Sequence, residues 1–240
     1  MKILIIGAME AEIALLKTFF APLEKNQLKD LQLFQARHSQ HELYFAEIGI
    51  GKVNAAYATA KILHFLAPDL VMNVGTSGNL SAQLKLGDVV VATSSTYWDV
   101  DVSAFNYAIG QVPKMPATYP MHTKWVALAK TTKLMADIQI ASGPIVSGDS
   151  FIAEAETKQR IQMLFPYALA VDMESTAIAQ VCHLENTPLC IIRSITDSSS
   201  DGAALSHEAF LKISSENAGR VVNTLLASEL ESFLPFKSIQ

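Results

Sequence analysis

The chain has 240 residues, of which half are hydrophobic and only 17% are charged, with a formal net charge of −5. This length suits one large α/β domain or two small ones. A charged fraction below the usual value of about a quarter predicts a large core and surface left for a partner subunit. The net negative charge argues against nucleic acid as the main ligand.

The start of the chain and its two cysteines both favour a cytoplasmic protein. The apolar run at residues 3–6 is too short for a signal peptide, and Glu10 and Glu12 follow it directly. No apolar run reaches the roughly 18 residues that a membrane span needs. Cys182 and Cys190 lie in apolar segments without metal-ligand spacing. We therefore expect two buried free thiols, with no disulfide and no metal.

Apolar runs and helical periodicity alternate along the chain. In chain order they predict a strand at 3–6, a helix at 11–20, strands at 31–36 and 42–48, a helix at 53–66, strands at 70–74 and 88–92, a helix at 125–135, a strand at 138–146, a helix at 154–164, a strand at 168–171, a helix from near Met173, a strand at 189–192 and a helix at 207–230. Residues 103–122 lack periodicity and are predicted to form a long functional loop. Short connections without a linker predict one domain over residues 1–240, of class α/β, with three α/β/α layers and a central mixed sheet.

Glu174 lies just after a predicted strand, where a helix begins. The helix N-terminus would stabilise a carboxylate there by about 0.3–1 kcal/mol, which is a purely structural interpretation. A carboxylate is also a natural bidentate acceptor for two neighbouring hydroxyl groups, such as those of ribose. Asp172 precedes Glu174 by two residues, and the turn between strand and helix leaves open whether the two acids share a side.

Arg193 and Asp197 follow the apolar run at 189–192. An arginine at a strand end is often a surface residue whose stem covers the core, and Arg193 could equally form an ion pair with Asp197. The functional alternative needs Asp197 to be partly buried, so that its raised pKa lets it donate a proton near neutral pH. Thr196 could then orient Asp197 by a hydrogen bond.

Other predicted strands also end in glycine, hydroxyl or acidic residues. Residues 75–79 form either a tight turn or a close approach to a ligand, and they do not match a phosphate loop; nor do residues 49–52. Phe151 is either a core aromatic or a platform for a flat ring. Glu10 and Glu12 are either first-turn helix acids or site residues. Because ligands of open α/β proteins bind at the carboxyl ends of strands, these ends together suit one polar ligand.

The combined motifs resemble one family. They are IIGAMEAE at 5–12, GIGKV at 49–53, NVGTSG at 73–78, GDVV at 87–90, VSGDSFI at 146–152, VDMESTA at 171–177 and RSITD at 193–197. In this order they resemble the 5′-methylthioadenosine/S-adenosylhomocysteine nucleosidases of the nucleoside phosphorylase superfamily. The resemblance covers nearly the whole chain. It implies a nucleoside phosphorylase-like fold and a cofactor-free enzyme that hydrolyses the N-glycosidic bond of these nucleosides, and of 5′-deoxyadenosine, releasing adenine.

The resemblance also implies catalytic roles. Glu12 would hold and deprotonate the attacking water, helped by Arg193 and the Thr76 hydroxyl. Glu174 would bind the ribose hydroxyls, and Asp197 would protonate adenine at N7. Such an acid contributes roughly 10²–10⁴-fold to the rate.

The implied substrate contacts come from several segments of a homodimer. Thr196 would support Asp197, Met173 would lie beside Glu174, Phe151 would stack on adenine with Ile152 and Gly78 near the base, and Met9, Ile50, Val102 and Phe105 would line the 5′-thio pocket. Val102 and Phe105 would come from the second subunit. No nucleic acid or membrane is expected as a partner.

Five residues depart from the family's usual pattern. Thr76 and Thr196 stand where serine is common, Asp172 replaces a glutamate and Ser175 an alanine. His207 replaces a phenylalanine that caps the 5′-alkylthio pocket, so this position bears on which 5′ group the substrate carries. Alternatives within the fold are a 6-amino-6-deoxyfutalosine nucleosidase and a phosphate-dependent purine nucleoside phosphorylase. An alternative of another class is a non-catalytic nucleoside-binding module.

Overall fold

The computed structural model describes residues 1–132, 138–197 and 203–227. Its strands are β1 (Lys2–Gly7), β2 (Glu24–Leu28), β3 (Leu31–His38), β4 (His41–Glu47), β5 (Leu70–Asn79), β6 (Val89–Tyr97), β7 (Tyr119–Pro120), β8 (Ile140–Ser147), β9 (Ala170–Asp172) and β10 (Leu189–Ile195). Its helices are α1 (Glu10–Phe19), α2 (Lys52–Leu66), the 3-10 helix η1 (Ser103–Phe105), α3 (Thr123–Ala129), α4 (Ala155–Leu164), α5 (Ser175–Leu184) and α6 (Ala203–Ala227). The predicted α/β class is confirmed.

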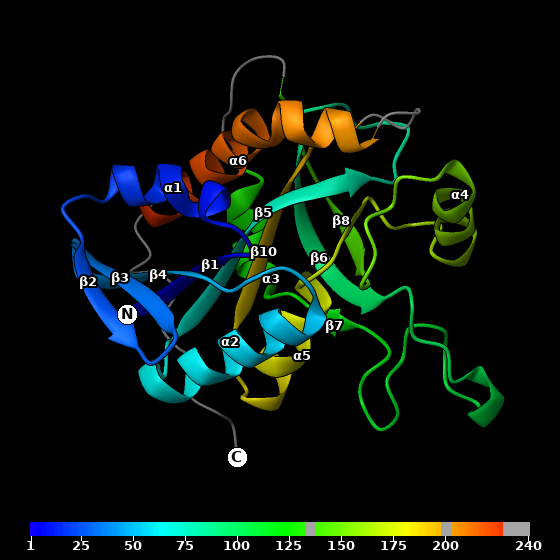
Figure 1. Cartoon of the computed structure of the whole chain (residues 1–240), viewed down its shortest axis with the longest axis horizontal. Coiled ribbons are helices and arrows are strands. Elements are labelled where there is room, and N and C mark those ends of the chain that lie inside the picture. Colours follow the sequence, from blue (N-terminus) through cyan, green and yellow to red (C-terminus); the bar gives the residue numbers. More distant parts are fainter. Residues whose placement is uncertain (133–137, 198–202, 228–240) are drawn as a thin grey trace.

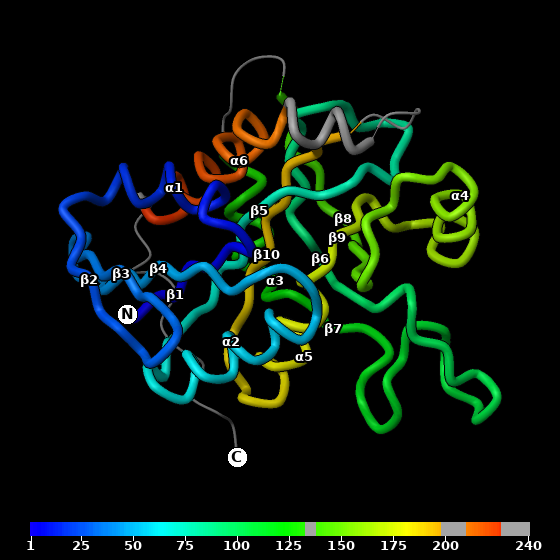
Figure 2. The backbone as a smooth tube through the Cα atoms, viewed as in Figure 1, coloured from blue at the N-terminus to red at the C-terminus, as the bar shows by residue number. Residues whose placement is uncertain are grey.

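The strands form one mixed sheet of ten. β1 runs parallel to β4 and β5, and β5 runs parallel to β10. Figure 2 shows these strands, from the beginning, middle and end of the chain, side by side. Because β5 pairs with both β9 and β10, the strands β5, β10, β6, β8 and β9 close into a ring. This ring brings the ends of β5, β9 and β10 together.

Helices cover both faces of the sheet, as predicted (Figure 1). In that view α1 packs on α6 above the sheet, and α2 packs on α5 below it. The segment between β6 and β7, which carries η1, extends away from the sheet at the lower right. Within the described ranges, no helix combines the length and apolar character needed to cross a membrane.

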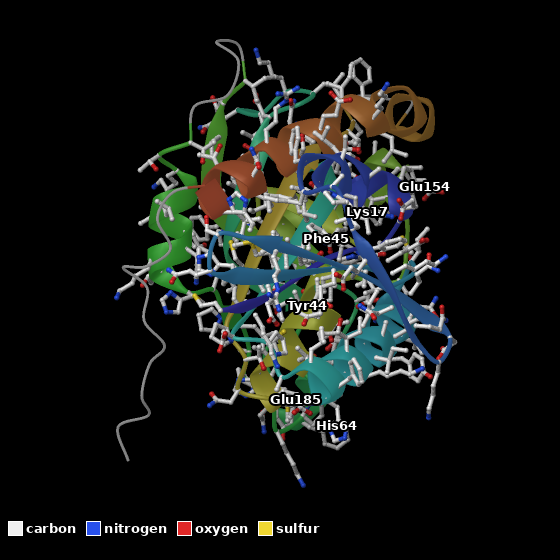
Figure 3. The ribbon with its side chains drawn as sticks, turned by 90° about the vertical axis from the view of Figure 1, so that its left-hand side faces the viewer. Lys17, Tyr44, Phe45, His64, Glu154 and Glu185 are labelled. Atoms are coloured by element: carbon white, nitrogen blue, oxygen red, sulfur yellow. The ribbon has the colours of Figure 1, made fainter. Side chains whose placement is uncertain are left out.

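The core fills the space between the sheet and its helices. Neighbouring residues of a strand point to opposite faces. Phe45 of β4 therefore lies on the side of α1, where it stacks on Phe20 at 6.0 Å, while Tyr44 lies on the other side (Figure 3). Cys182 and Cys190 are buried free thiols, as predicted, and burial raises the pKa of each to about 12.

Several predicted boundaries were wrong. β2 was missed because its sequence is polar and exposed, and it pairs only with β3. β5 and β10 continue beyond 74 and 192, because their mutual pairing extends to Ser77 and Ile195. Residues 75–79 are therefore strand rather than a tight turn. Parts of two predicted helices, 133–135 and 228–230, lie outside the described residues.

Candidate active site

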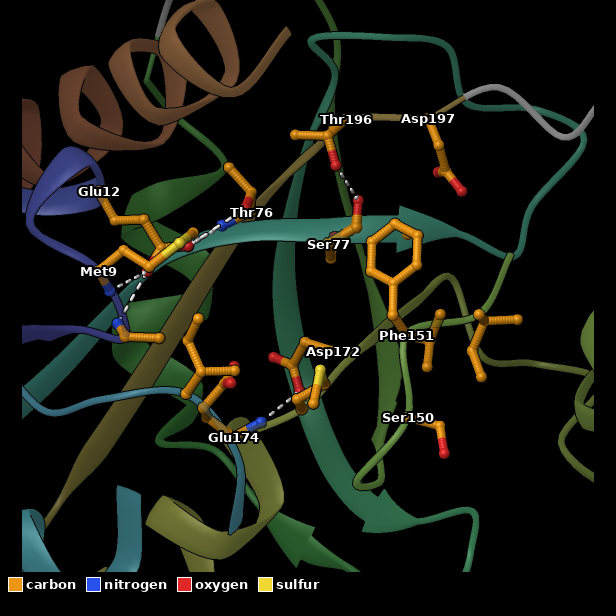
Figure 4. Close-up of a pocket in the computed structure, with 16 residues that line it drawn as sticks. Met9, Glu12, Thr76, Ser77, Ser150, Phe151, Asp172, Glu174, Thr196 and Asp197 are labelled. Carbon is orange, nitrogen blue, oxygen red and sulfur yellow. Dashed lines mark hydrogen bonds between the residues drawn. The ribbon is translucent and has the colours of Figure 1, made fainter. Parts of the chain in front are cut away.

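A pocket opens where β1, β5, β8, β9 and β10 end (Figure 4). It is lined by Ala8, Met9, Glu12, Ile50, Thr76, Ser77, Gly78, Ser150, Phe151, Ile152, Val171, Asp172, Met173, Glu174, Thr196 and Asp197. All the predicted site residues except Arg193, Val102 and Phe105 are among them. Glu12 and Met9 lie on one side, Thr196, Asp197 and Phe151 on the other, and Glu174 below.

Glu12 is a buried carboxylate held by four donors. Its Oε2 accepts hydrogen bonds from the backbone N–H groups of Ala8 at 2.8 Å and Met9 at 3.2 Å. Its Oε1 accepts from the backbone N–H of Thr76 at 2.8 Å and from the Thr76 hydroxyl at 3.1 Å. Glu12 lies in the first turn of α1, but these bonds fix it to β5 as well. The interpretation of Glu12 as only a first-turn acid was therefore wrong.

Gly75 of β5 leaves room for two charged side chains. A Cβ there would lie 2.5 Å from Glu12 Oε1 and 2.7 Å from Arg193 Nη1. Both distances are shorter than any real Cβ contact, so these atoms occupy the space that a side chain would fill. Gly75 is needed for this close approach and not for a turn, since it lies inside a strand.

Arg193 lies behind the pocket, inside β10, and is 2% exposed. Its Nε donates to Asp172 Oδ2 at 2.7 Å and its Nη2 to Ser175 Oγ at 2.9 Å. Its Nη1 is buried and has no hydrogen-bond partner among the described residues. The surface interpretation of Arg193 was wrong, because β10 continues past it and Asp172 supplies a buried counter-charge.

Glu174 occupies the N-cap position of α5, and its side chain faces the pocket (Figure 4). Its Oε1 accepts a hydrogen bond from the backbone N–H of Gly51 at 2.9 Å. Burial, reinforced by the charge of Asp172, raises the pKa of Glu174 to about 7. Both acids line the pocket, but Asp172 is paired with the buried Arg193, whereas Glu174 accepts from the backbone of Gly51.

Asp197 follows β10 and is 5% exposed, which is the burial that the functional interpretation requires. Its Oδ1 accepts a hydrogen bond from the backbone N–H of Asn79 at 2.6 Å. The Thr196 hydroxyl donates to the carbonyl of Ser77 at 3.2 Å and so ties the end of β10 to β5. Gly78 lies beside Asp197, since a Cβ there would be 3.5 Å from Asp197 Oδ2.

Phe151 is 49% exposed and lines the pocket, so its interpretation as a core aromatic was wrong. It belongs to the loop that follows β8. Asp149 fastens this loop to α2 by accepting from the backbone N–H of Lys52 at 2.7 Å. Lys52 also forms an ion pair with Asp99 at 2.8 Å. The Asp149 bond therefore anchors the loop two residues before Phe151.

Val102 and Phe105 do not line the pocket of their own chain. Phe105 lies on η1 and is 75% exposed, whereas Val102 is half-buried. The pocket residues that the sequence did not single out are Ala8, Ser77, Ser150 and Val171. The backbone donors of Ala8 and Gly51 left no signal in the sequence, because any residue can supply an N–H.

The fold and this pocket are those of a phosphorylase superfamily protein. The family model described as "Phosphorylase superfamily" matches residues 2–227, so the chain belongs to that superfamily.

Similar proteins and solved structures identify the family within this superfamily. A 5′-methylthioadenosine/S-adenosylhomocysteine nucleosidase of Staphylococcus carnosus is 37% identical over 224 residues, covering 93% of this chain and 98% of that protein. The same nucleosidase of Neisseria meningitidis, solved with methylthio-immucillin-A, is 38% identical with a TM-score of 0.90, covering 95% and 99% of the two chains. A futalosine hydrolase of Helicobacter pylori is 30% identical with a TM-score of 0.88, covering 94% and 97%. The chain belongs to the 5′-methylthioadenosine/S-adenosylhomocysteine nucleosidase family.

Proposed function

We propose that the protein hydrolyses the N-glycosidic bond of 5′-methylthioadenosine and S-adenosylhomocysteine, releasing adenine and the 5-thioribose product. The observation that carries this proposal is the pair of buried acids, Glu12 and Asp197, on opposite sides of one pocket (Figure 4). Hydrolysis of a glycosidic bond needs an acid at the leaving group and a base at the attacking water. The pocket supplies one of each.

Asp197 is the acid in this reaction. When the bond between C1′ and N9 breaks, its electron pair passes to the adenine ring and leaves an oxocarbenium-like sugar. A proton delivered to N7 makes adenine a better leaving group, and Asp197 delivers it. Phe151 stacks on the ring, and Gly78 and the backbone of Ile152 lie along its edge. Asp197 also suits adenine better than asparagine would, because adenine's 6-amino group donates a hydrogen bond.

Glu12 is the base. Water attacks C1′ and transfers one proton to Glu12, so that the sugar gains a hydroxyl group. The Thr76 hydroxyl and the free Nη1 of Arg193 lie beside Glu12 and hold this water. A carboxylate at this position repels phosphate, and it therefore favours hydrolysis over phosphorolysis. An uncharged residue here would remove that discrimination.

The Glu174 carboxylate accepts hydrogen bonds from the two hydroxyl groups of the ribose, and Met173 lies beside Glu174. The sugar becomes positively charged as the bond breaks, and a carboxylate in a site that excludes water stabilises that charge. Met9 and Ile50 line the end of the pocket that receives the 5′-thio group.

The protein acts as a homodimer in the cytoplasm, according to the same proposal. Val102 and Phe105 of one subunit complete the 5′-thio pocket of the other. Val53 and Tyr57 lie on α2, shortly after Ile50 in the chain. Their exposed side chains supply apolar surface for this contact. Sedimentation equilibrium should give twice the mass of one chain, and a monomer at assay concentration would contradict the homodimer.

The pH dependence of kcat/KM should report the ionisation of Glu174. Only the ionised carboxylate accepts hydrogen bonds from both ribose hydroxyls. Since the pKa of Glu174 is raised to about 7, the binding-competent fraction grows as pH rises through 7. We expect kcat/KM to fall about tenfold for each pH unit below 7. A kcat/KM that is flat down to pH 5 would contradict the raised pKa of Glu174.

A comparison of substrates tests the proposed activity. We expect methylthioadenosine and S-adenosylhomocysteine to give the highest kcat/KM, followed by 5′-deoxyadenosine, with 6-amino-6-deoxyfutalosine last. A preference for 6-amino-6-deoxyfutalosine would support the activity of the futalosine hydrolase relative instead. The comparison varies the 5′ group because His207 departs from the family pattern at the cap of the 5′-alkylthio pocket. The His207 side chain lies outside the described residues. Binding without adenine release from any of the four would indicate a non-catalytic module.

A further inference from the structure

Ser175, the first residue of α5, is completely buried and uses its whole hydrogen-bonding capacity. A hydroxyl group has one donor and two acceptor lone pairs. The Ser175 hydroxyl donates to Asp172 Oδ2. It accepts from Arg193 Nη2 at 2.9 Å and from Asn73 Nδ2 at 3.2 Å. Ser175 therefore connects the side chains of Asp172, Arg193 and Asn73.

Two bonds on one edge of the Arg193 guanidinium fix its direction. Nε donates to Asp172 and Nη2 donates to Ser175, and the group is planar and rigid. The remaining nitrogen, Nη1, must then point along a fixed line. That line leads to the space beside Gly75 that Nη1 shares with Glu12 Oε1. Nη1 is buried there without a hydrogen-bond partner in the part of the chain that the structure describes.

Asp172 does not depend on the Ser175 hydroxyl for its own position. Its Oδ1 accepts from the Ser147 hydroxyl at 2.6 Å and from the backbone N–H groups of Glu174 at 3.3 Å and Ser175 at 3.1 Å. Without the Ser175 hydroxyl, Asp172 would stay in place and keep its bond to Nε. Arg193 would then be held on this edge by one bond instead of two, and Nη1 would lose its fixed direction.

We propose that Ser175 is a positioning residue that aims Arg193 Nη1 at the water beside Glu12. This inference rests on the proposed hydrolysis. According to this proposal, Ser175 acts on the half of the site that holds the water and not on the half that binds adenine and ribose. The contacts to adenine and ribose come from Phe151, Asp197 and Glu174, none of which is held by the Ser175 hydroxyl. Loss of that hydroxyl should slow the attack of water and leave substrate binding intact.

The test is Ser175→Ala in the full-length protein with methylthioadenosine as substrate. We expect kcat to fall roughly 10- to 100-fold, as for a misplaced catalytic group, with KM changed by less than about threefold. The matched control is Ser194→Ala. Ser194 is equally buried and adjacent to Arg193, but its hydroxyl donates only to the Gly87 carbonyl, at 3.1 Å. The control should keep both constants near their wild-type values.

A second variant tests the geometry directly. In Asp172→Glu/Ser175→Ala, the longer carboxylate can reach both Nε and Nη2 of Arg193 as a bidentate acceptor. We expect kcat to return to at least about a third of wild type. A Ser175→Ala enzyme with wild-type kcat, or a double variant as slow as the single one, would overturn the role of Ser175. A wild-type protein that releases no adenine would instead overturn the proposed function, and this inference with it.

Discussion

Asp197→Asn is expected to slow adenine release by about 10²–10⁴-fold, the usual contribution of a general acid. Asparagine has no proton to give to N7, so the electron pair of the broken bond would collect on an unprotonated adenine. Its carbonyl oxygen can still accept the hydrogen bond from the backbone N–H of Asn79, which spans 2.6 Å in the wild-type structure. The variant should therefore fold normally and bind nucleoside within about tenfold of wild type.

Single-turnover measurement of adenine release, together with calorimetric titration of an unreactive nucleoside analogue, separates the two effects. The matched control is Asp88→Asn. Asp88 is 1% exposed and accepts backbone hydrogen bonds from Lys85 and Gln139, but it lies outside the pocket. Its variant should keep the wild-type rate per folded molecule. Unchanged turnover in Asp197→Asn would remove Asp197 from the acid role.

Glu12→Gln is expected to have an effect on the rate of similar size, roughly 10²–10⁴-fold, because an amide cannot take the proton from water. This variant should also lower stability. One carboxylate oxygen accepts from Thr76, and the other accepts from the N–H groups of Ala8 and Met9. A glutamine amide puts N–H groups against donors on one of these sides. An unmet buried hydrogen bond of this kind costs about 1–3 kcal/mol.

Thermal melting and steady-state kinetics on the same preparation distinguish these two losses. Glu10→Gln is the control, because Glu10 lies in the same helical turn but is exposed and pairs with Lys17. It should melt and turn over like wild type. A Glu12→Gln enzyme that retains more than about a tenth of the wild-type rate would exclude Glu12 as the base.

Apart from β2 and the two-residue β7, the chain pattern predicted the strand and helix order, because buried strands and amphipathic helices have their own periodicities. It also indicated where Glu174 and Asp197 would gather, since the carboxyl ends of strands meet at one edge of a sheet. The hydrogen-bond partners of Glu12 could not be predicted from the sequence in the same way. Its contact with Thr76 joins residues 64 positions apart.

Arg193 shows most clearly what the sequence could not predict. Its environment depends on the extension of β10 alongside β5, and that pairing is a tertiary feature with no local signal. From the sequence, only Asp197 was considered as an ion-pair partner of Arg193. In the structure the buried bond from Arg193 Nε goes to Asp172. Backbone donors such as the N–H of Gly51 are equally invisible in a side-chain pattern.

The most direct test of the central claim is the identity of the nucleophile. Purified enzyme is incubated with 5′-methylthioadenosine in phosphate-free buffer and again with added inorganic phosphate, and the sugar product is identified by mass spectrometry. The proposed role of Glu12 predicts adenine and 5-methylthioribose at the same rate in both buffers. Turnover that requires phosphate and yields the sugar 1-phosphate would contradict it.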